Sequence, residues 1–269
     1  MGAPLGQHFL TNKAALRKIV AVLGLKKNDW IIEIGPGHGE LTELISEAGD
    51  EIGGLKLSAI ERDADLAEAL GKKLDKKAEI FFGNALQQLP RIVETGVGAH
   101  QSYKIVGNIP YYITGHLLRV IAELKNKPAL TVLLIQKEVA ERILAEPPRM
   151  NLLAASVQFW ARPELIAVIP KKDFAPPPKV DSAVIKLETA PSDPKEAGNY
   201  YRAIKIFFSQ PRKTLVNNVK SSLSGEKTGR LEDFLEKLGL LGLSETVRAQ
   251  NLSIDAIKTL SKCCIINEK

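Results

Sequence analysis

Short apolar runs that alternate with stretches of helical periodicity dominate the first two thirds of this 269-residue chain. Such a run fits a buried strand, whereas apolar residues three or four positions apart mark one face of a helix. Repetition of strand and helix in this order predicts a doubly wound α/β fold with a mainly parallel sheet. The predicted parallel strands are Trp30–Ile34, Leu57–Ile60, Glu79–Phe82, Tyr103–Val106 and Ala129–Ile135. Two later runs, Leu165–Ile169 and Ser182–Leu187, are expected to close the sheet edge as an antiparallel pair.

A polar stretch that contains two prolines, Ala190–Lys195, separates this part of the chain from a helical remainder. We expect helices at 201–208, 211–222, 230–238 and 254–263, and hence one domain at 1–189 and a small all-helical domain at 190–269. The net charge is +6, and 13 basic against 9 acidic side chains fall from residue 190 onward. This bias favours a polyanionic partner such as nucleic acid, although a basic surface also serves solubility alone.

Composition excludes several other classes of protein. No apolar run approaches the roughly 18 residues that a membrane-spanning helix needs, and the first residues lack the pattern of a signal peptide. The only cysteines, Cys263 and Cys264, are adjacent, and the four histidines show no metal-ligand spacing. The sequence therefore predicts a cytoplasmic protein with no membrane segment, no disulfide framework and no metal.

The first predicted strand runs directly into a glycine-rich loop, Gly35-Pro36-Gly37-His38-Gly39. Glycines at this place let the backbone turn sharply and approach a ligand at the carboxyl ends of parallel strands. The spacing is Gly-x-Gly-x-Gly rather than the Gly-x-Gly-x-x-Gly of dinucleotide folds, so a ligand without phosphates is expected. The alternative is a plain strand-to-helix turn.

Polar residues follow the next two predicted strands. Glu61 ends the second strand, where a carboxylate can accept hydrogen bonds from both hydroxyls of a ribose. Asn84 follows the third strand, where its amide could meet an adenine amino group. The alternatives are a capping or solvated acid at Glu61 and an ordinary turn residue at Asn84.

The fourth predicted strand is followed by Asn108-Ile109-Pro110-Tyr111. The side-chain carbonyl of Asn108 and the backbone carbonyl of Pro110 can both accept hydrogen bonds from one exocyclic amine of a planar base. That arrangement aims the nitrogen lone pair at an electrophilic methyl while the ring of Tyr111 stacks on the base. Taken alone, the motif is also an ordinary proline turn with a tyrosine that packs. Its place beside the other three strand ends favours methylation of an amine by a nucleoside-bearing donor.

At this point the sequence resembles the small-subunit rRNA adenine dimethyltransferase family along nearly its whole length. The segments that carry the resemblance are Gly6–Leu10, the glycine loop, Glu61–Asp63, Asn108–Thr114, Gln136–Val139, Phe174–Val184 and Gln210–Asn217. The resemblance implies a Rossmann-like methyltransferase sheet with a helical C-terminal domain and S-adenosylmethionine as methyl donor. It also implies two adjacent adenosines of an rRNA hairpin in a pre-assembled small ribosomal subunit as substrate. The same resemblance implies four methyl transfers per RNA, a role in subunit biogenesis and a monomeric enzyme.

The resemblance further implies roles for individual residues. The donor site would comprise His8, Leu10, Gly35, Gly37, Glu61, Arg62, Asn84, Ala85 and Asn108. The catalytic residues would be Asn108, Pro110, Tyr111 and Phe174, with the two aromatic rings on either side of a target adenine that has left its stack. The chain departs from the family pattern at His8, where Asn is usual, at Asn84, where Asp is usual, and at Glu146–Leu153, which lacks a glycine-containing loop.

The segment Gln210–Lys220 is the expected RNA contact in the C-terminal domain. With Pro211 in the first turn of a helix, Lys213 and Lys220 fall on one face and Arg212 flanks them. Lys179, in the proline-rich motif Pro176–Val184, is also assigned to RNA. The alternative for the helix is a solvated charged face.

Three other functions compete with this prediction. A large-subunit rRNA adenine methyltransferase of the macrolide-resistance type is the nearest, and Asp181-Ser182-Ala183 with the long helical tail favours the small-subunit enzyme. A non-catalytic ribosome-assembly or transcription factor of the same fold is opposed by the complete Asn-Ile-Pro-Tyr motif and glycine loop. A small-molecule methyltransferase is opposed by the basic C-terminal domain.

Overall fold

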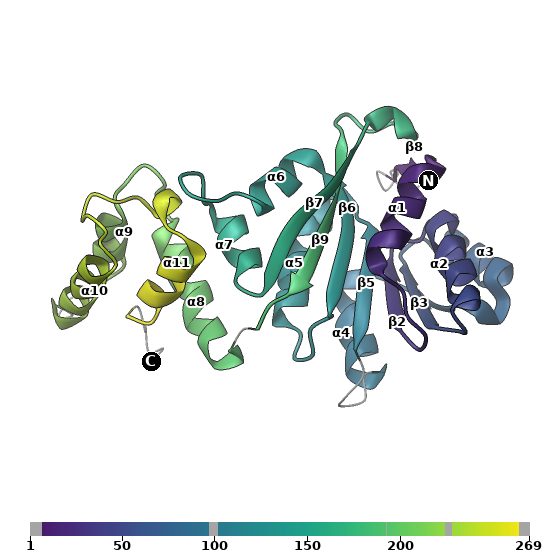
Figure 1. The fold of residues 1–269 in the computed structure, drawn as a ribbon, viewed down its shortest axis with the longest axis horizontal. Helices are drawn as coiled ribbons and strands as arrows, with labels where there is room; N and C mark the ends of the chain where they lie inside the picture. Colours follow the sequence, from purple (N-terminus) through teal and green to yellow (C-terminus); the bar gives the residue numbers. More distant parts are fainter. Residues whose placement is uncertain (1–6, 97–101, 192, 224–227, 264–269) are drawn as a thin grey trace. The chain divides into compact units, whose positions relative to one another are not determined.

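The structure, a computed structural model, describes residues 7–96, 102–191, 193–223 and 228–263. Its main sheet has seven strands in the order β4-β3-β2-β5-β6-β9-β7 (Figure 1). The strands are β2 Trp30–Ile34, β3 Lys56–Glu61, β4 Glu79–Phe82, β5 Tyr103–Asn108, β6 Leu130–Gln136, β7 Ala161–Ile169 and β9 Ser182–Thr189. Strands β2 to β6 pair in parallel, and β9 runs antiparallel to β6. The predicted fold class is therefore confirmed.

Helices cover both faces of this sheet (Figure 1), which explains why its central strands are apolar throughout. All five residues of β2 are buried. The helices that accompany the sheet are α1 Lys13–Leu23, α2 Glu40–Glu51, α3 Ala64–Leu74, α4 Ala85–Gly96, α5 Thr114–Glu123 and α6 Lys137–Ile143. Short polar side chains start two of them, since Asn12 and Asp63 each accept two backbone N–H groups of the first turn.

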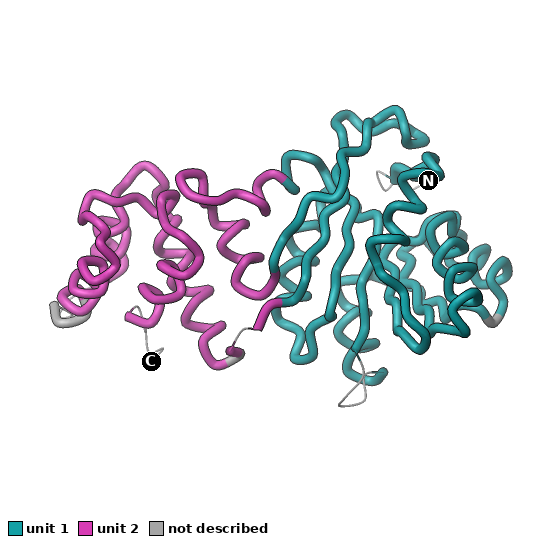
Figure 2. Tube along the Cα trace, viewed as in Figure 1, with its two compact units in different colours: residues 1–140, 162–189 teal, residues 141–161, 190–269 magenta. Residues whose placement is uncertain are grey.

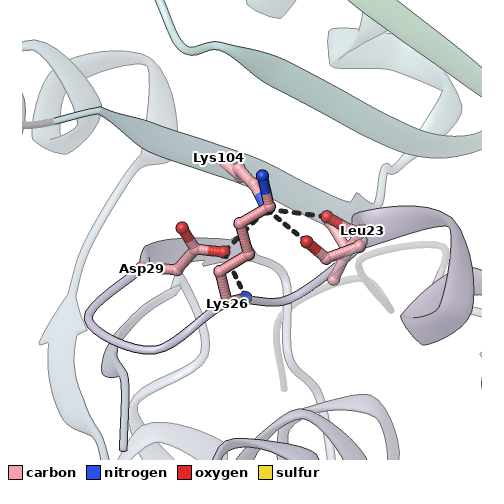
Figure 3. Close-up of polar contacts among 5 residues, drawn as sticks. Leu23, Lys26, Asp29 and Lys104 are labelled. Atoms are coloured by element: carbon pink, nitrogen blue, oxygen red, sulfur yellow. Dashed lines mark hydrogen bonds and ion pairs between the residues drawn. The ribbon is translucent and has the colours of Figure 1, made fainter. Parts of the chain in front are cut away.

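A lysine inside the sheet ties α1 to the strands at their amino-terminal edge (Figure 3). Lys104 Nζ of β5 donates to the carbonyls of Leu23 and Gly24, at 2.8 Å each, and lies 2.6 Å from Asp29 Oδ2. Both carbonyls belong to the carboxyl end of α1, where a cation is stabilised by the helix dipole. The Lys104 and Asp29 side chains are 13% and 17% exposed, so this ion pair is largely shielded from solvent.

A second, two-stranded sheet was not predicted. It pairs β1, Phe9–Leu10, antiparallel with β8, Phe174–Ala175, so that Leu10 faces Phe174 in register. Both of these side chains are buried in the hydrophobic core that α1 and β6 share. The pairing fixes the residues just before α1 against the start of the proline-rich motif.

The chain divides into two compact units, residues 1–140 with 162–189 and residues 141–161 with 190–269 (Figure 2). One division falls between residues 189 and 190, and residues 141–161, placed in the first domain by sequence, group with the helical unit. The reason is visible in its packing: Tyr200 donates to the carbonyl of Ala155 at 2.8 Å and stacks on Phe159 at 4.1 Å between ring centroids. Helices of this unit are α7 Leu152–Gln158, α8 Pro194–Phe207, α9 Leu215–Ser222, α10 Thr228–Leu240 and α11 Ile254–Ser261.

Three expectations for the helical unit were wrong in their bounds, and one of them, the helix expected at 201–208, already begins at Pro194. The stretch 190–195 is a shorter linker than expected, because Asp193 caps α8 and Pro194 already lies in its first turn. The helix expected at 211–222 begins only at Leu215, because the Thr214 hydroxyl accepts the Asn217 N–H and caps it there. Lys213 therefore precedes the helix and does not share a helical face with Lys220.

Among the residues that the structure describes, no helix is both long and apolar enough to cross a membrane. Within the same ranges, no group of three or more His, Cys, Asp or Glu side chains could hold a metal ion. Cys264 and His100 lie outside the described residues.

Candidate active site

A cavity of about 210 Å³ lies at the carboxyl ends of the parallel strands, within the first unit. The glycine loop, the ends of β3, β4 and β5 and the residues before β1 all contribute to it. Its lining residues are Gln7, His8, Phe9, Ile34, Gly35, Gly37, Ile60, Glu61, Arg62, Gly83, Asn84, Ala85, Asn108, Ile109, Pro110, Tyr111, Tyr112 and Ile113. The four strand ends singled out by sequence thus meet at one place, as ligand sites of open α/β sheets do.

The glycine loop takes a backbone form that other residues rarely adopt. Gly35 and Gly37 have φ angles of 69° and 59°. A Cβ on Gly37 would lie 2.6 Å from the ring of Phe9, so only glycine fits under that ring. The loop therefore comes close to the cavity with its backbone exposed to a ligand.

Glu61 is the most strongly held side chain of the cavity. It is 4% exposed, and its carboxylate accepts three backbone N–H groups. Gly37 donates to Oε2 at 3.1 Å, while Arg62 and Asp63 donate to Oε1 at 2.7 and 2.9 Å. Since a carboxylate offers about four acceptor positions, Oε2 keeps one position for a ligand hydroxyl.

Asn84 lines the cavity and also begins α4. Its Oδ1 accepts the N–H of Leu86 at 3.0 Å, as the turn alternative anticipates. Ala85 lies beside it in the cavity wall. The residue is therefore at the expected place, with its Nδ2 group and one Oδ1 lone pair left for a ligand.

The Asn-Ile-Pro-Tyr segment is oriented by groups far away in sequence. Asn108 Nδ2 donates to the carbonyl of His8 at 2.8 Å, which leaves its Oδ1 as the acceptor. The Pro110 carbonyl accepts the Ile113 N–H at 3.1 Å and retains a second lone pair. Tyr111 is half-buried, and its hydroxyl lies 3.0 Å from Ser182 Oγ.

Two residues that the resemblance places against ligands are instead packed in the core. Leu10 and Phe174 are both buried, Phe174 to 4% exposure, and neither lines the main cavity. Leu10 lines a smaller neighbouring cavity with Gly35 and Asn108. The paired strands β1 and β8 turn both side chains inward, so this conformation presents Tyr111 alone of the two proposed stacking rings.

Sequence reasoning missed several residues of the site. Phe9 and Tyr112 line the main cavity, and Glu33 lines the smaller one. Glu33 could have been found, because it is the only acid in the apolar strand Trp30–Ile34. It is 1% exposed, and burial raises the pKa of its carboxyl to about 8, with the nearby carboxylates of Glu61 and Glu40 adding to the effect. Nothing in the sequence distinguishes Phe9 or Tyr112 from core aromatics.

The four residues predicted to bind RNA are all exposed. Lys179 lies between β8 and β9 in the first unit. Arg212 and Lys213 lie in the turn before α9, and Lys220 lies in its last turn.

Comparison with known proteins agrees with this geometry. A dimethyladenosine transferase from Plasmodium falciparum has the same fold, with a TM-score of 0.74 and 23% identity over 94% of this chain and 96% of that one. The 23S rRNA methyltransferase ErmE superposes with a TM-score of 0.72 and 18% identity over 95% and 99% of the two chains. Both comparisons show the fold of this chain, a doubly wound sheet with a cavity at the carboxyl ends of its parallel strands.

Sequence similarity then gives the family. The ribosomal RNA small subunit methyltransferase A of Dehalococcoides mccartyi is 36% identical over 98% of this chain and 88% of its own. The sequence model of the family "Ribosomal RNA adenine dimethylase" matches residues 3–263. The chain belongs to the ribosomal RNA adenine dimethylase family.

Proposed function

We propose that this protein dimethylates the N6 amines of two adjacent adenosines in small-subunit rRNA, with S-adenosylmethionine as donor. The observation that carries the proposal is the convergence of Glu61, Asn108 and Tyr111 on one cavity beside the glycine loop. The full-length similarity to a protein named as a small-subunit rRNA methyltransferase supports the choice of RNA.

The donor occupies the part of the cavity between the glycine loop and Asn84 in this proposal. Oε2 of Glu61 accepts a hydroxyl of the donor ribose, since one of its acceptor positions is open. The backbone of Gly35 and Gly37 contacts the methionine part, because no side chain intervenes there. Asn84 meets the adenine at the end of β4 with the part of its amide that the helix cap does not use.

The methyl transfer is a direct displacement at the sulfonium methyl. The target amine is a poor nucleophile because its lone pair is delocalised into the adenine ring. Hydrogen bonds from the amine to Asn108 Oδ1 and to the Pro110 carbonyl favour the pyramidal form and stabilise the positive charge that develops on nitrogen. Bound S-adenosylmethionine would supply an electrophilic sulfonium methyl, and the amine would lose its proton to solvent after accepting that methyl.

Orientation of the Asn108 amide is the part of this mechanism that the fold supplies. Because Nδ2 is held by the His8 carbonyl at 2.8 Å, Oδ1 is the atom free to face a substrate amine. Tyr111, which lines the cavity with its hydroxyl near Ser182, provides the ring on which the extruded adenine stacks. Phe174 requires a displacement of β8 to take part, so we assign it to packing.

The partner in this proposal is the rRNA of a pre-assembled small subunit, bound through exposed cations of both units. Charge reversal of Arg212, Lys213 and Lys220 should weaken subunit binding and flatten its salt dependence by about one unit of slope for each phosphate that is no longer neutralised. Donor affinity should not change. The matched control is charge reversal of three exposed lysines that precede strands at the amino-terminal edge of the sheet, Lys26, Lys27 and Lys125. If both variants bind the subunit equally well, the cations near α9 form a solvated charged surface and do not contact RNA.

A large-subunit rRNA adenine methyltransferase is the second candidate, because ErmE shares the fold over 95% of this chain. Fold alone does not separate the two. The test is methyl transfer from labelled donor to unmethylated small and large subunits, followed by digestion and mass analysis of the product nucleosides. Dimethyladenosine at adjacent positions of small-subunit rRNA is the expected product, and label in the large subunit alone would overturn the assignment.

We further propose that the enzyme acts as a monomer in the cytoplasm, where ribosomal subunits assemble. Each chain carries a complete cavity within its first unit, so no second copy is needed to form it. Light scattering of the purified protein at micromolar concentration checks this, and a mass of twice 29.4 kDa would contradict it.

A further inference from the structure

Two exposed side chains meet across the mouth of the cavity. Arg62 Nη1 donates to the hydroxyl of Tyr112 at 3.1 Å, and both residues line the cavity. Tyr112 is 56% exposed, so its ring is not part of the core. The contact therefore lies at the surface, at the cavity and outside the core.

The sheet order shows what this hydrogen bond crosses. Arg62 directly follows β3, and Tyr112 lies in a 3-10 turn, Tyr111–Ile113, that follows β5. Strand β2 lies between β3 and β5, so the two strand ends are about 10 Å apart at the usual spacing of neighbouring strands. The bridging side chains therefore pass over the carboxyl end of β2, where Gly35 and Gly37 shape the cavity floor.

The backbone at both ends of this side-chain bridge is fixed by hydrogen bonds, whereas the two side chains are exposed. The backbone N–H of Arg62 is held by Glu61 Oε1 at 2.7 Å. The turn that carries Tyr112 is closed by the bond from the Ile113 N–H to the Pro110 carbonyl. Only the two side chains have to rotate for the bridge to open.

We propose that Arg62 and Tyr112 form a strap that closes over the bound donor and controls how fast donor and product exchange. This inference rests on the proposed donor site, since a nucleoside bound beside Glu61 lies beneath the strap. Each methyl transfer leaves S-adenosylhomocysteine in the cavity, and two dimethylated amines require four donor molecules. Exchange of product for donor is thus a repeated step for this enzyme, and Tyr112 is a further donor-retaining residue.

The strength of the contact sets the size of the effect. A hydrogen bond between exposed side chains changes the population of the closed form by about 2- to 10-fold. The strap consequently slows exchange without trapping the ligand. Its removal should accelerate both binding and release, and should change the equilibrium affinity less than either rate.

The experiment compares Tyr112→Phe, Arg62→Met and the double variant. Release of radiolabelled S-adenosylhomocysteine into excess unlabelled product is followed by rapid filtration, and donor binding by stopped flow. We expect release about 3- to 10-fold faster in each single variant. The double variant should be no faster than the singles, because both lose the same bond. Phe82→Leu, an exposed aromatic at the end of β4 that does not line the cavity, is the matched control and should release product at the wild-type rate.

Two results would overturn the strap, and they are distinguishable. The strap is refuted if Tyr112→Phe and Arg62→Met exchange ligand at the wild-type rate, or if their effects add independently. In either case the donor site stands, provided that Glu61→Gln still weakens donor binding. Wild-type donor affinity in Glu61→Gln as well would remove the donor site and the strap together.

Discussion

Replacement of Glu61 by Gln gives the sharpest test of the donor site, because the structure fixes what the carboxylate does before any ligand arrives. Its two oxygens accept three backbone N–H groups, two at Oε1 and one at Oε2. Glutamine keeps the shape of the side chain but has one carbonyl oxygen and one NH2 group. The better orientation puts the carbonyl toward Arg62 and Asp63 and turns the NH2 group toward the Gly37 N–H.

Two costs follow from that orientation. The Gly37 N–H loses its acceptor, and an unpaired buried donor costs about 1–3 kcal/mol, so the variant should be less stable by about that amount. The donor hydroxyl loses a charged acceptor, and hydrogen bonds to charged groups contribute about 1.5–3 kcal/mol. Donor affinity should therefore fall by roughly 10- to 150-fold. Glu61→Ala is the poorer test, because it leaves three N–H groups without an acceptor and confuses binding with folding.

Calorimetric titration of S-adenosylmethionine into the folded variant measures the affinity, and thermal unfolding measures the stability. Glu68→Gln is the matched control, because Glu68 is an exposed acid on α3 paired with Lys72 at 2.6 Å, and such surface pairs contribute little. The control should match the wild type in both measurements. Wild-type donor affinity in folded Glu61→Gln would refute the placement of the ribose beside this carboxylate.

Four further substitutions test other parts of the structure. Asn108→Ala should lower single-turnover methylation by orders of magnitude with little change in donor affinity, and a wild-type rate would remove it from the mechanism. Phe174→Leu should lower the free energy of unfolding by about 1–2 kcal/mol, and with it the melting temperature, because the ring is buried. A methylation defect at unchanged stability would instead support stacking on the target base. Lys104→Met should cost about 2–4 kcal/mol in urea unfolding because the Asp29 carboxylate keeps the Lys26 N–H but loses its cation, and a loss below about 1 kcal/mol would show that the pair is not structural. Glu33 has a pKa raised from 4.5 to about 8, so the folded state holds a proton that the unfolded state releases, and stability should fall by roughly 3–5 kcal/mol as pH rises from 4.5 to 8. Glu33→Gln should remove that slope, and an unchanged slope would mean that the acid is ionised in the fold.

The parallel strands could be predicted because a strand buried on both faces has a continuous apolar sequence. The same is true of the cavity edge, because glycines after β2 and a carboxylate at the end of β3 are local signals at places that the fold class assigns to ligands. Asn108 and Tyr111 followed in the same way, because each belongs to a strand end. What the sequence predicted was therefore mostly local or repeated at a regular interval.

One error came from a pairing between distant residues and another from a local helix cap. Two-residue strands such as β1 and β8 are too short for any periodicity, and their register, Leu10 opposite Phe174, exists only in the folded chain. That pairing is why Phe174 is in the core. The helix α9 was predicted four residues too long because Pro211 suits a first turn, but the Thr214 cap decides where the helix begins.

The short strand β1 also connects the hydrophobic core to the residues that line the cavity. Its neighbour His8 offers the carbonyl that fixes the Asn108 amide, and Phe9 lies so close to Gly37 that no side chain fits between them. The orientation of the Asn108 amide and the shape of the glycine loop thus depend on the same few residues, which are held by β8 and by the start of α1. Because β8 leads into the proline-rich motif that contains Lys179, the backbone pairing of β1 with β8 connects that motif to the residues that hold Asn108 and Gly37.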